Sequence, residues 1–224
     1  MREEIYLDEE IDRSDLKVPS DPILYKDYKR FLYSLEETSK VYSERNIALL
    51  KLQIGTGYRL QDLTDLTIGD IKEFLLRRKF VIQEKKQIRA WETYIKNNPG
   101  SSRNKPKKRE VEIEPRSELE NILKKYIKGK KKSEYAFPSE GKYGYITPKS
   151  FSRILKNAGE NIGLKNISGH SGRKTYATWL LEDTGDMAFV SRQLGHKSQV
   201  TTMLYIGSAK KDRKRASSLI SRRL

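Results

Sequence analysis

Apolar residues recur at every third or fourth position along most of the chain, a spacing that places them on one face of an α-helix. This pattern predicts a mainly helical protein. Glycines and N-capping Ser or Thr residues mark the boundaries between the helices. The expected helices begin near Asp21, Ser43, Arg59, Ser117 and Thr147, and further helices cover Arg173–Leu181, Met187–Leu194 and Thr202–Tyr205.

Two short segments have the pattern of β-strands instead. Lys79–Gln83 (KFVIQ) is rich in β-forming residues, and Glu110–Glu114 (EVEIE) alternates acidic and apolar positions. The connection between them, about residues 84–109, is long, polar and basic, so we expect a β-hairpin with an extended, mobile tip. The predicted fold class is therefore mainly α with one small antiparallel β-sheet (α+β).

The charge of the chain points to an acidic partner. Lys and Arg number 46 against 30 Asp and Glu, which gives a formal net charge of +16 and a pI near 9.8. Met1–Asp15 holds seven acidic and two basic residues, so the excess of positive charge lies in the rest of the chain. Nucleic acid is the partner that such a charge favours most.

Charge and apolar pattern together divide the chain into three parts. We predict an acidic N-terminal arm over residues 1–20, one domain over 21–208 that contains the hairpin insertion, and a basic C-terminal tail over 209–224. The first residues lack the apolar stretch of a signal peptide, and no apolar run is long enough to span a bilayer. We therefore expect a cytoplasmic protein without a membrane partner.

The chain holds no Cys and only two His residues. This composition excludes disulfides, thiolate catalysis and cysteine-based zinc sites, and two imidazoles are too few for most transition-metal sites. We therefore predict no metal site. Both imidazoles fall in one stretch, Gly169–Gly207, where His170 stands three residues before Arg173 and His196 nine residues before Tyr205.

Five short motifs occur in a fixed order from about Arg45 to Gly207. They are TGYRLQDLTDL, a lysine in the predicted hairpin, HSGR, LGHKS and LY. In this order and spacing the chain resembles the catalytic domain of the tyrosine recombinase (phage-type integrase) family. Most members of that family also carry an N-terminal core-binding domain of about a hundred residues, for which the forty or so residues before the Arg59 region leave no room, so we expect that domain to be absent.

The resemblance implies that DNA is cut and rejoined by transesterification without a cofactor or a metal. Tyr205 would be the nucleophile that forms a 3′-phosphotyrosine bond. Arg59 and Arg173 would hold the nonbridging phosphate oxygens, because guanidinium groups are planar, charged donors. His170 would be the general base, and His196 would donate a hydrogen bond to a nonbridging oxygen.

A lysine in the hairpin would protonate the leaving 5′-oxygen. FVIQEKKQ places Lys86 where the lysine of the family pattern falls, with Lys85 as the nearest rival and Lys105 and Lys107 further along. Asp62 is expected to orient Arg59 and His170. Contacts with DNA phosphates are expected from Lys174, Lys197, Lys105, Lys107 and Lys108.

The resemblance further implies double-stranded DNA as the partner, a homo-tetramer assembled on it, and accessory DNA-bending proteins. The predicted function is site-specific recombination or integration. Two alternatives stay open at this point. A type IB topoisomerase uses the same residue types but relaxes supercoils as a monomer, and a non-catalytic relic would bind DNA without forming a covalent adduct.

Overall fold

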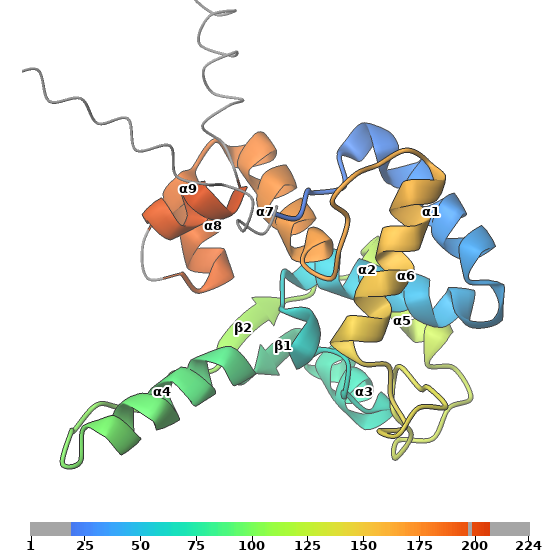
Figure 1. Ribbon diagram of the computed structural model, residues 1–224. Helices are drawn as coiled ribbons and strands as arrows, with labels where there is room; N and C mark the ends of the chain where they lie inside the picture. The colour runs from blue at the N-terminus through green and yellow to red at the C-terminus, as the bar shows by residue number, and fades with distance from the viewer. Residues whose placement is uncertain (1–18, 197–198, 207–224) are drawn as a thin grey trace, which may run out of the picture.

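The computed structural model describes residues 19–196 and 199–206. Within these ranges it consists of helices and one two-stranded antiparallel sheet, which confirms the predicted fold class (Figure 1). The C-terminal tail and nearly all of the acidic arm lie outside the described residues. In chain order the elements are α1 (Tyr25–Thr38), α2 (Ser43–Thr56), α3 (Ile68–Arg77), β1 (Lys79–Ile82), α4 (Lys85–Asn97), β2 (Arg109–Glu112), α5 (Glu118–Tyr126), α6 (Pro148–Asn161), α7 (Ser171–Thr184), α8 (Met187–Leu194) and α9 (Gln199–Ile206).

Helix α2 lies at the centre of the core. Leu49, Leu50 and Leu52 point in different directions around the helix and all three are fully buried, which is typical of a helix covered on every side. Helices α1, α5 and α7 pack against it, and α1 also lies along α6 (Figure 1). The C-terminal end of α2 therefore brings the segment that follows, including Arg59, into the middle of the molecule.

The two strands pair as the sequence predicts. Lys79 lies opposite Glu112 and Ile82 opposite Arg109 in the antiparallel register. Phe80 is fully buried and packs against Phe74 of α3, with ring centroids 4.6 Å apart. The hairpin is thereby fixed to the body of the protein at its base.

The predicted extended tip of the hairpin is wrong, because helix α4 fills the first half of the connection. Ile88, Trp91 and Ile95 recur at helical spacing, so this segment has an apolar stripe that its basic composition conceals. The Trp91 Nε1–H donates to the carbonyl oxygen of Arg103 at 2.8 Å, and the Arg103 guanidinium lies 4.5 Å from the Tyr94 ring centroid. The return segment therefore folds back along α4, which points away from the body (Figure 1).

A second difference concerns the helix predicted to begin near Arg59. Arg59 itself is extended, a short 3₁₀ turn covers Leu60–Asp62, and helix α3 begins only at Ile68. Thr67 and Asp70 form a capping box at that point, which fixes the start of α3. Leu60 and Leu63 are buried in the irregular segment, so their helical spacing reflects burial rather than a helix.

The last three helices of the described chain form a smaller layer at one end of the molecule. Ala177 of α7 and Val190 and Leu194 of α8 make a second apolar cluster, and Tyr205 of α9 packs against it. Helix α9 contacts both α7 and α8. The predicted nucleophile is thus placed next to the helix that carries Arg173.

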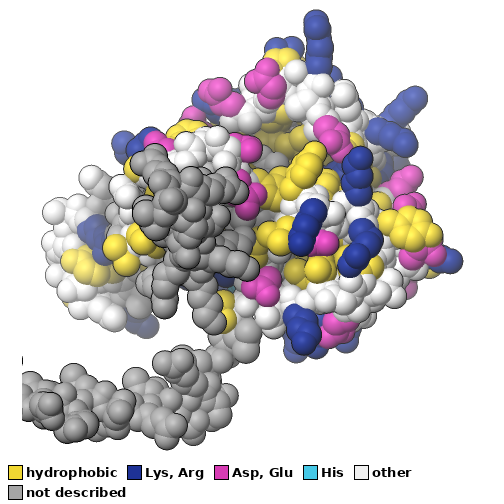
Figure 2. Space-filling model, turned by 90° about the horizontal axis from the view of Figure 1, so that it is seen from above, with side chains coloured by type: hydrophobic (Ala, Val, Ile, Leu, Met, Phe, Trp, Pro, Cys, Tyr) yellow, Lys and Arg dark blue, Asp and Glu magenta, His cyan; other side chains and the backbone are white. Residues whose placement is uncertain are grey.

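The face seen from above in Figure 2 carries acidic and basic side chains close together. No helix within residues 19–196 and 199–206 is long and apolar enough to cross a bilayer. The same ranges contain no cluster of three or more His, Cys, Asp or Glu side chains placed to bind a metal ion.

Candidate active site

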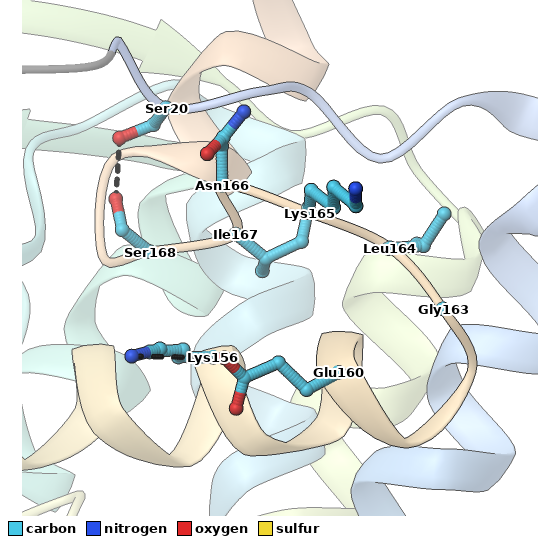
Figure 3. A pocket seen from close by; sticks show the side chains of 9 residues that line it. All are labelled: Ser20, Lys156, Glu160, Gly163, Leu164, Lys165, Asn166, Ile167 and Ser168. Atoms are coloured by element: carbon cyan, nitrogen blue, oxygen red, sulfur yellow. Dashed lines mark hydrogen bonds and ion pairs between the residues drawn. The ribbon is translucent and has the colours of Figure 1, made fainter.

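Three of the residues predicted to carry the chemistry line a hollow of about 450 Å³ between the α2–α3 segment and the starts of α4, α6 and α7. Arg59, Lys86 and His170 come from three distant parts of the chain and all line it. A larger hollow of about 610 Å³ lies between α6 and the segment 163–168 (Figure 3). It contains the Lys156–Glu160 pair and none of the predicted catalytic residues, so the smaller hollow is the candidate site.

The turn after α2 aims Arg59 at this site. Gly57 ends the helix with φ +61°, a left-handed conformation that glycine adopts without strain. A Cβ at this position would also overlap the ring of Tyr176. The motif T-G-Y-R therefore contains a glycine because the chain must reverse within one residue against α7.

Helix α7 presents His170 and Arg173. His170 is the N-cap residue and Arg173 lies in the first turn. Gly172 between them packs so closely on α2 that an added Cβ would overlap the side chain of Gln53. Gln53 also donates to the carbonyl oxygen of Gly169 at 2.8 Å. The H-S-G-R motif is thus held against the end of α2, beside Arg59.

Arg173 is 2% exposed and all its described contacts are internal. Its Nη1 donates to the carbonyl oxygen of Gly57 at 2.7 Å, and its Nη2 donates to that of Leu194 at 2.7 Å. Burial and the nearby Arg59 guanidinium lower the pKa of Arg173 to about 10, while Glu84 acts in the opposite direction. The guanidinium is therefore charged at neutral pH and fixed in orientation.

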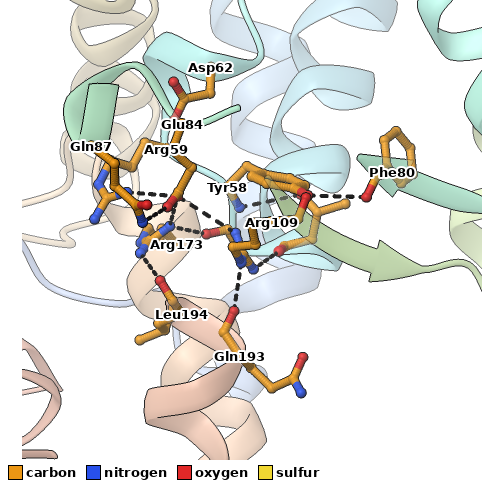
Figure 4. A network of polar contacts seen from close by, with 12 residues as sticks. Tyr58, Arg59, Asp62, Phe80, Glu84, Gln87, Arg109, Arg173, Gln193 and Leu194 are labelled. Carbon is orange, nitrogen blue, oxygen red and sulfur yellow. Dashed lines mark hydrogen bonds and ion pairs between the residues drawn. The ribbon is translucent and has the colours of Figure 1, made fainter. Parts of the chain in front are cut away.

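Glu84 joins the two predicted phosphate-binding arginines (Figure 4). Its Oε1 lies 2.7 Å from Arg59 Nη1 and 3.2 Å from Arg173 Nη1. Its Oε2 accepts a hydrogen bond from Gln87 Nε2 at 2.6 Å. Glu84 is 1% exposed. Glu84 was not predicted from the sequence, because a lone acid at the end of a strand carries no signal that singles it out.

Arg109 is a third buried guanidinium that the sequence analysis also missed (Figure 4). It donates to the carbonyl oxygens of Gln193 and Thr56, at 2.7 and 2.5 Å, and lies over the Tyr58 ring at 4.3 Å. Its Nη1 is 3.9 Å from Glu84 Oε1. Arg109 therefore ties β2 to the ends of α2 and α8, around the same carboxylate.

Asp62 was expected to orient Arg59, but its hydrogen bond goes to a different partner. Asp62 Oδ1 accepts from the backbone N–H of Lys85 at 2.9 Å, and the carboxylate bonded to Arg59 is that of Glu84. The α2–α3 segment passes under the start of α4, which directs Asp62 to that backbone. Burial raises the pKa of Asp62, and the Lys85 hydrogen bond opposes this shift. Asp62 thus positions the start of α4.

The two candidate lysines point in different directions. Lys85 Nζ lies 2.6 Å from Asp65 Oδ1 and also donates to the carbonyl oxygen of Gln61. Lys86 is exposed and lines the hollow with Arg59 and His170. Partial burial, together with Arg173 and Lys86, lowers the pKa of His170. The His170 ring is therefore neutral at neutral pH, with Lys86 close enough to affect its charge.

Tyr205 lies on the other side of Arg173, next to His196. The two rings are 5.6 Å apart at 85°, and His196 Nδ1 lies 2.8 Å from the hydroxyl of Thr202. Burial, with Arg173 and Arg59 nearby, lowers the pKa of His196 to about 4. Burial raises the pKa of Tyr205 to about 12, although Arg173 and Arg59 lower it.

The Tyr205 hydroxyl is buried and makes no well-aligned hydrogen bond to any described residue, even though Arg173 is close enough to affect its pKa. Lys174 is buried rather than solvated, and its Nζ lies 5.3 Å from the Tyr205 ring centroid. The structure therefore brings together the six residues predicted as catalytic. They are Arg59, Lys86, His170, Arg173, His196 and Tyr205.

Three of the remaining predicted DNA contacts lie on the insertion between β1 and β2. Lys105, Lys107 and Lys108 are exposed on the return segment between α4 and β2. Lys197 lies outside the described residues. The hollow and the insertion are connected, because Lys86 in the first turn of α4 lines the hollow and the helix leads into this basic segment.

The model of the phage integrase family matches residues 23–212, which is most of the chain. The chain belongs to the phage integrase family. A probable integrase/recombinase, YoeC of Bacillus subtilis (strain 168), is 29% identical over 165 residues, which are 74% of this chain and 78% of that protein. The tyrosine recombinase XerD of Corynebacterium glutamicum is 30% identical over 72% of this chain, but the match covers only 47% of XerD.

Solved structures share the fold at low sequence identity. The XerA recombinase superposes with a TM-score of 0.61 at 20% identity, over 90% of this chain and 66% of XerA. The Tn1549 transposon integrase in complex with a circular intermediate DNA gives a TM-score of 0.60 at 16% identity, over 90% of this chain and 68% of the integrase chain. These neighbours confirm the fold, and the recombinase and integrase relatives do not favour the topoisomerase alternative.

Proposed function

We propose that this protein is a site-specific DNA recombinase that cuts and rejoins DNA through a covalent bond between Tyr205 and a 3′-phosphate. The observation that carries the proposal is the placement of Tyr205 and His196 beside Arg173, whose guanidinium shares Glu84 with that of Arg59. Membership of the phage integrase family over residues 23–212 supports the same reaction.

Arg59 and Arg173 bind the scissile phosphate in this proposal. Two guanidinium groups donate to the nonbridging oxygens and stabilise the negative charge that grows in the transition state. The Arg173 side chain is held by hydrogen bonds to two backbone carbonyls, so it needs little reorganisation when the charge develops. Arg109 is assigned a structural role, because its Nε and Nη2 donate to the backbone carbonyls of Gln193 and Thr56.

The proton of Tyr205 has to leave before the phenol oxygen attacks phosphorus. Burial raises the pKa of Tyr205 to about 12, and the nearby Arg173 and Arg59 oppose this shift because they favour the phenolate. His170 accepts the proton, since its lowered pKa keeps the ring neutral. As the phosphorus–oxygen bond to Tyr205 forms, the bond to the 5′-oxygen breaks.

Lys86 and His196 complete the reaction in this scheme. Lys86 donates a proton to the departing 5′-oxygen, and its position in the hollow supports it over Lys85, which is bonded to Asp65. We assign the Thr202 hydroxyl as the donor to His196 Nδ1, 2.8 Å away, which puts the ring proton on Nε2. That Nε2–H donates to a nonbridging oxygen. The reverse reaction rejoins the strand and regenerates Tyr205.

We further propose that the insertion between β1 and β2 binds the DNA next to the cut. Residues 85–108 contain eight basic residues and one acidic residue. Lys105, Lys107 and Lys108 are exposed, and α4 has no buried residue. Since α4 starts in the hollow and points outward (Figure 1), it lies along a path that flanking DNA can follow.

A homo-tetramer on DNA with accessory DNA-bending proteins, and a cytoplasmic location, remain predictions. Recombination exchanges four strands, and each protomer supplies one tyrosine. The chain spans less than half of the Corynebacterium XerD protein, so the activity of such a longer protein is carried over only as a proposal. Lys174 is proposed to approach the DNA beside Tyr205 rather than to lie in solvent.

Covalent capture tests the proposed function. The full chain is incubated with fragmented DNA of its source organism, the mixture is denatured, and DNA bound to protein is precipitated and sequenced. We expect adducts at a discrete site, their loss in Tyr205→Phe, and their retention in Tyr143→Phe, which alters a tyrosine that is 55% exposed. Adducts that persist in Tyr205→Phe would show that another residue is the nucleophile.

A further inference from the structure

Glu84 holds a position that a phosphate would be expected to occupy. Its Oε1 contacts Arg59 Nη1 and Arg173 Nη1 at once, at 2.7 and 3.2 Å, which are the distances of charge-assisted hydrogen bonds. These are the two guanidinium groups proposed to bind the scissile phosphate. One buried carboxylate oxygen therefore makes the contacts that a nonbridging phosphate oxygen requires.

The charges around Glu84 explain why an anion is needed there. Three guanidinium groups, those of Arg59, Arg109 and Arg173, lie within 4.0 Å of Oε1. Among the described residues, Glu84 is the only acidic side chain that forms an ion pair with any of them. Buried cations without a counter-charge are costly, so the site contains an anion whether or not DNA is bound.

Three hydrogen bonds to internal acceptors hold the Arg173 guanidinium in this arrangement. Two of its hydrogen bonds go to the backbone carbonyls of Gly57 and Leu194, which the ends of α2 and α8 fix. The third goes to Glu84, a side chain that can rotate. Among these three acceptors, only the carboxylate can move away without unfolding the surrounding structure.

We propose that Glu84 is a positioning residue that serves as the resident anion of the site, holding Arg59 and Arg173 together in the free protein and releasing them to the scissile phosphate. On exchange, the carboxylate keeps its hydrogen bond to Gln87 and turns toward Arg109. The inference rests on the proposed function in one respect, that the incoming anion is a DNA phosphate. Phosphate then competes with the Glu84 carboxylate for Arg59 and Arg173.

The two histidines allow this competition to be measured without knowledge of the DNA site. The chain has no others, so imidazole NMR signals report only on this site. The full protein is titrated with inorganic phosphate, and Glu84→Gln is compared with the wild type. We expect Glu84→Gln to bind phosphate about tenfold more tightly, because the amide leaves the cations without a competing charge.

A matched control separates this effect from the general loss of a buried acid. Glu120→Gln removes a carboxylate that is 5% exposed and pairs with Lys124 in α5, and we expect its phosphate affinity to equal that of the wild type. Unchanged or weaker phosphate binding in Glu84→Gln would overturn the proposal, since a purely structural Glu84 would lose arginine alignment when neutralised.

A second variant serves if Glu84→Gln does not fold. Gln87→Leu keeps the charge of Glu84 but removes the hydrogen bond to Oε2, and we expect phosphate affinity to rise several-fold because the carboxylate is easier to displace. Unchanged affinity would count against the exchange. Failure of Tyr205 to form adducts would leave these titrations unaffected, so the two proposals fail separately.

Discussion

Arg173 shows how a single side chain can be fixed by its surroundings. Its guanidinium bonds to two backbone carbonyls and one carboxylate, all within the body of the protein. A lysine has the same charge but a single nitrogen, so it cannot reach acceptors on α2, α8 and α4 at the same time. The residue type is therefore required by geometry as well as by charge.

Replacing Arg173 by Lys is expected to lower the rate of adduct formation by about 10²–10³, the range for loss of one transition-state donor. The free energy of unfolding should also fall, by about 2–3 kcal/mol, because buried acceptors lose their partner. Capture assays and urea unfolding measure the two effects. Arg153→Lys on the exposed side of α6 is the control, and similar losses there would contradict the assignment.

His196 makes the stability of the protein depend on pH. Its pKa is about 4 in the folded protein, below the ordinary value of 6.5, so between these values the unfolded chain binds a proton that the folded chain does not. The contribution of the neutral His196 imidazole to the free energy of unfolding is therefore fully present above pH 6.5, and it is lost as the pH decreases toward 4. We expect the free energy of unfolding to fall by about 2 kcal/mol more in the wild type than in His196→Asn over this range.

Urea unfolding at a series of pH values, with both proteins in the same buffers, measures this difference. Carboxylates that titrate in the same range affect both proteins equally and cancel in the comparison. Parallel curves for the wild type and His196→Asn would show that the imidazole is not buried beside Arg173 as described.

At the scale of elements, the junction between α2 and the Arg59 segment decides where the phosphate-binding side chain points. The helix ends at Gly57, and Tyr58 behind it donates its hydroxyl to the Arg109 carbonyl oxygen at 2.6 Å. The junction therefore connects the core helix to the hairpin. A change in the turn is transmitted to Arg59 without altering any charged residue.

Gly57→Ala is expected to lower the free energy of unfolding by about 2–4 kcal/mol, from left-handed strain plus overlap with Tyr176. Gly163→Ala provides the control, since it has φ +76° but no atom within 4 Å of an added Cβ, and it should cost only about 1–2 kcal/mol. Chemical denaturation gives both values. Equal losses would mean that Tyr176 does not pack against the turn.

Helix α4 shows why an element can escape prediction. The insertion looks like a polar connection because basic residues dominate it, yet Ile88, Trp91 and Ile95 recur at helical spacing. The predicted loop rests on composition, whereas the periodicity of these three residues favours the helix that forms. The catalytic lysine is affected as well, because the first turn of a helix sends Lys85 and Lys86 to different sides.

At the scale of the whole molecule, the net charge of +16 makes DNA binding strongly dependent on salt. Each phosphate that a lysine or arginine neutralises releases counterions, so the logarithm of affinity falls with the logarithm of salt concentration. The slope of this dependence is proportional to the number of phosphates that the protein neutralises. The location of those contacts decides which substitutions change it.

Replacing Lys105, Lys107 and Lys108 together by Gln is expected to reduce the magnitude of that slope by about three on double-stranded DNA. Replacing Lys128, Lys131 and Lys132, which are exposed after α5, removes the same charge away from the site and should change the slope by less than one. Fluorescence anisotropy at several salt concentrations gives both slopes. Equal changes of slope in the two triple variants would show that the DNA does not bind along the insertion.

Hydrophobic periodicity predicted the helical class and the paired strands, because it is a local property that one chain displays directly. The six candidate catalytic residues came from the resemblance to the tyrosine recombinase family, which left Lys85 as a rival to Lys86. Tertiary structure alone decided which carboxylate meets the arginines, Glu84 rather than Asp62, and that Arg109 joins them. Glu84 is 25 residues from Arg59 and 89 from Arg173. Side chains so far apart are brought into contact only by the packing of α2, α7 and the hairpin, which no local pattern records.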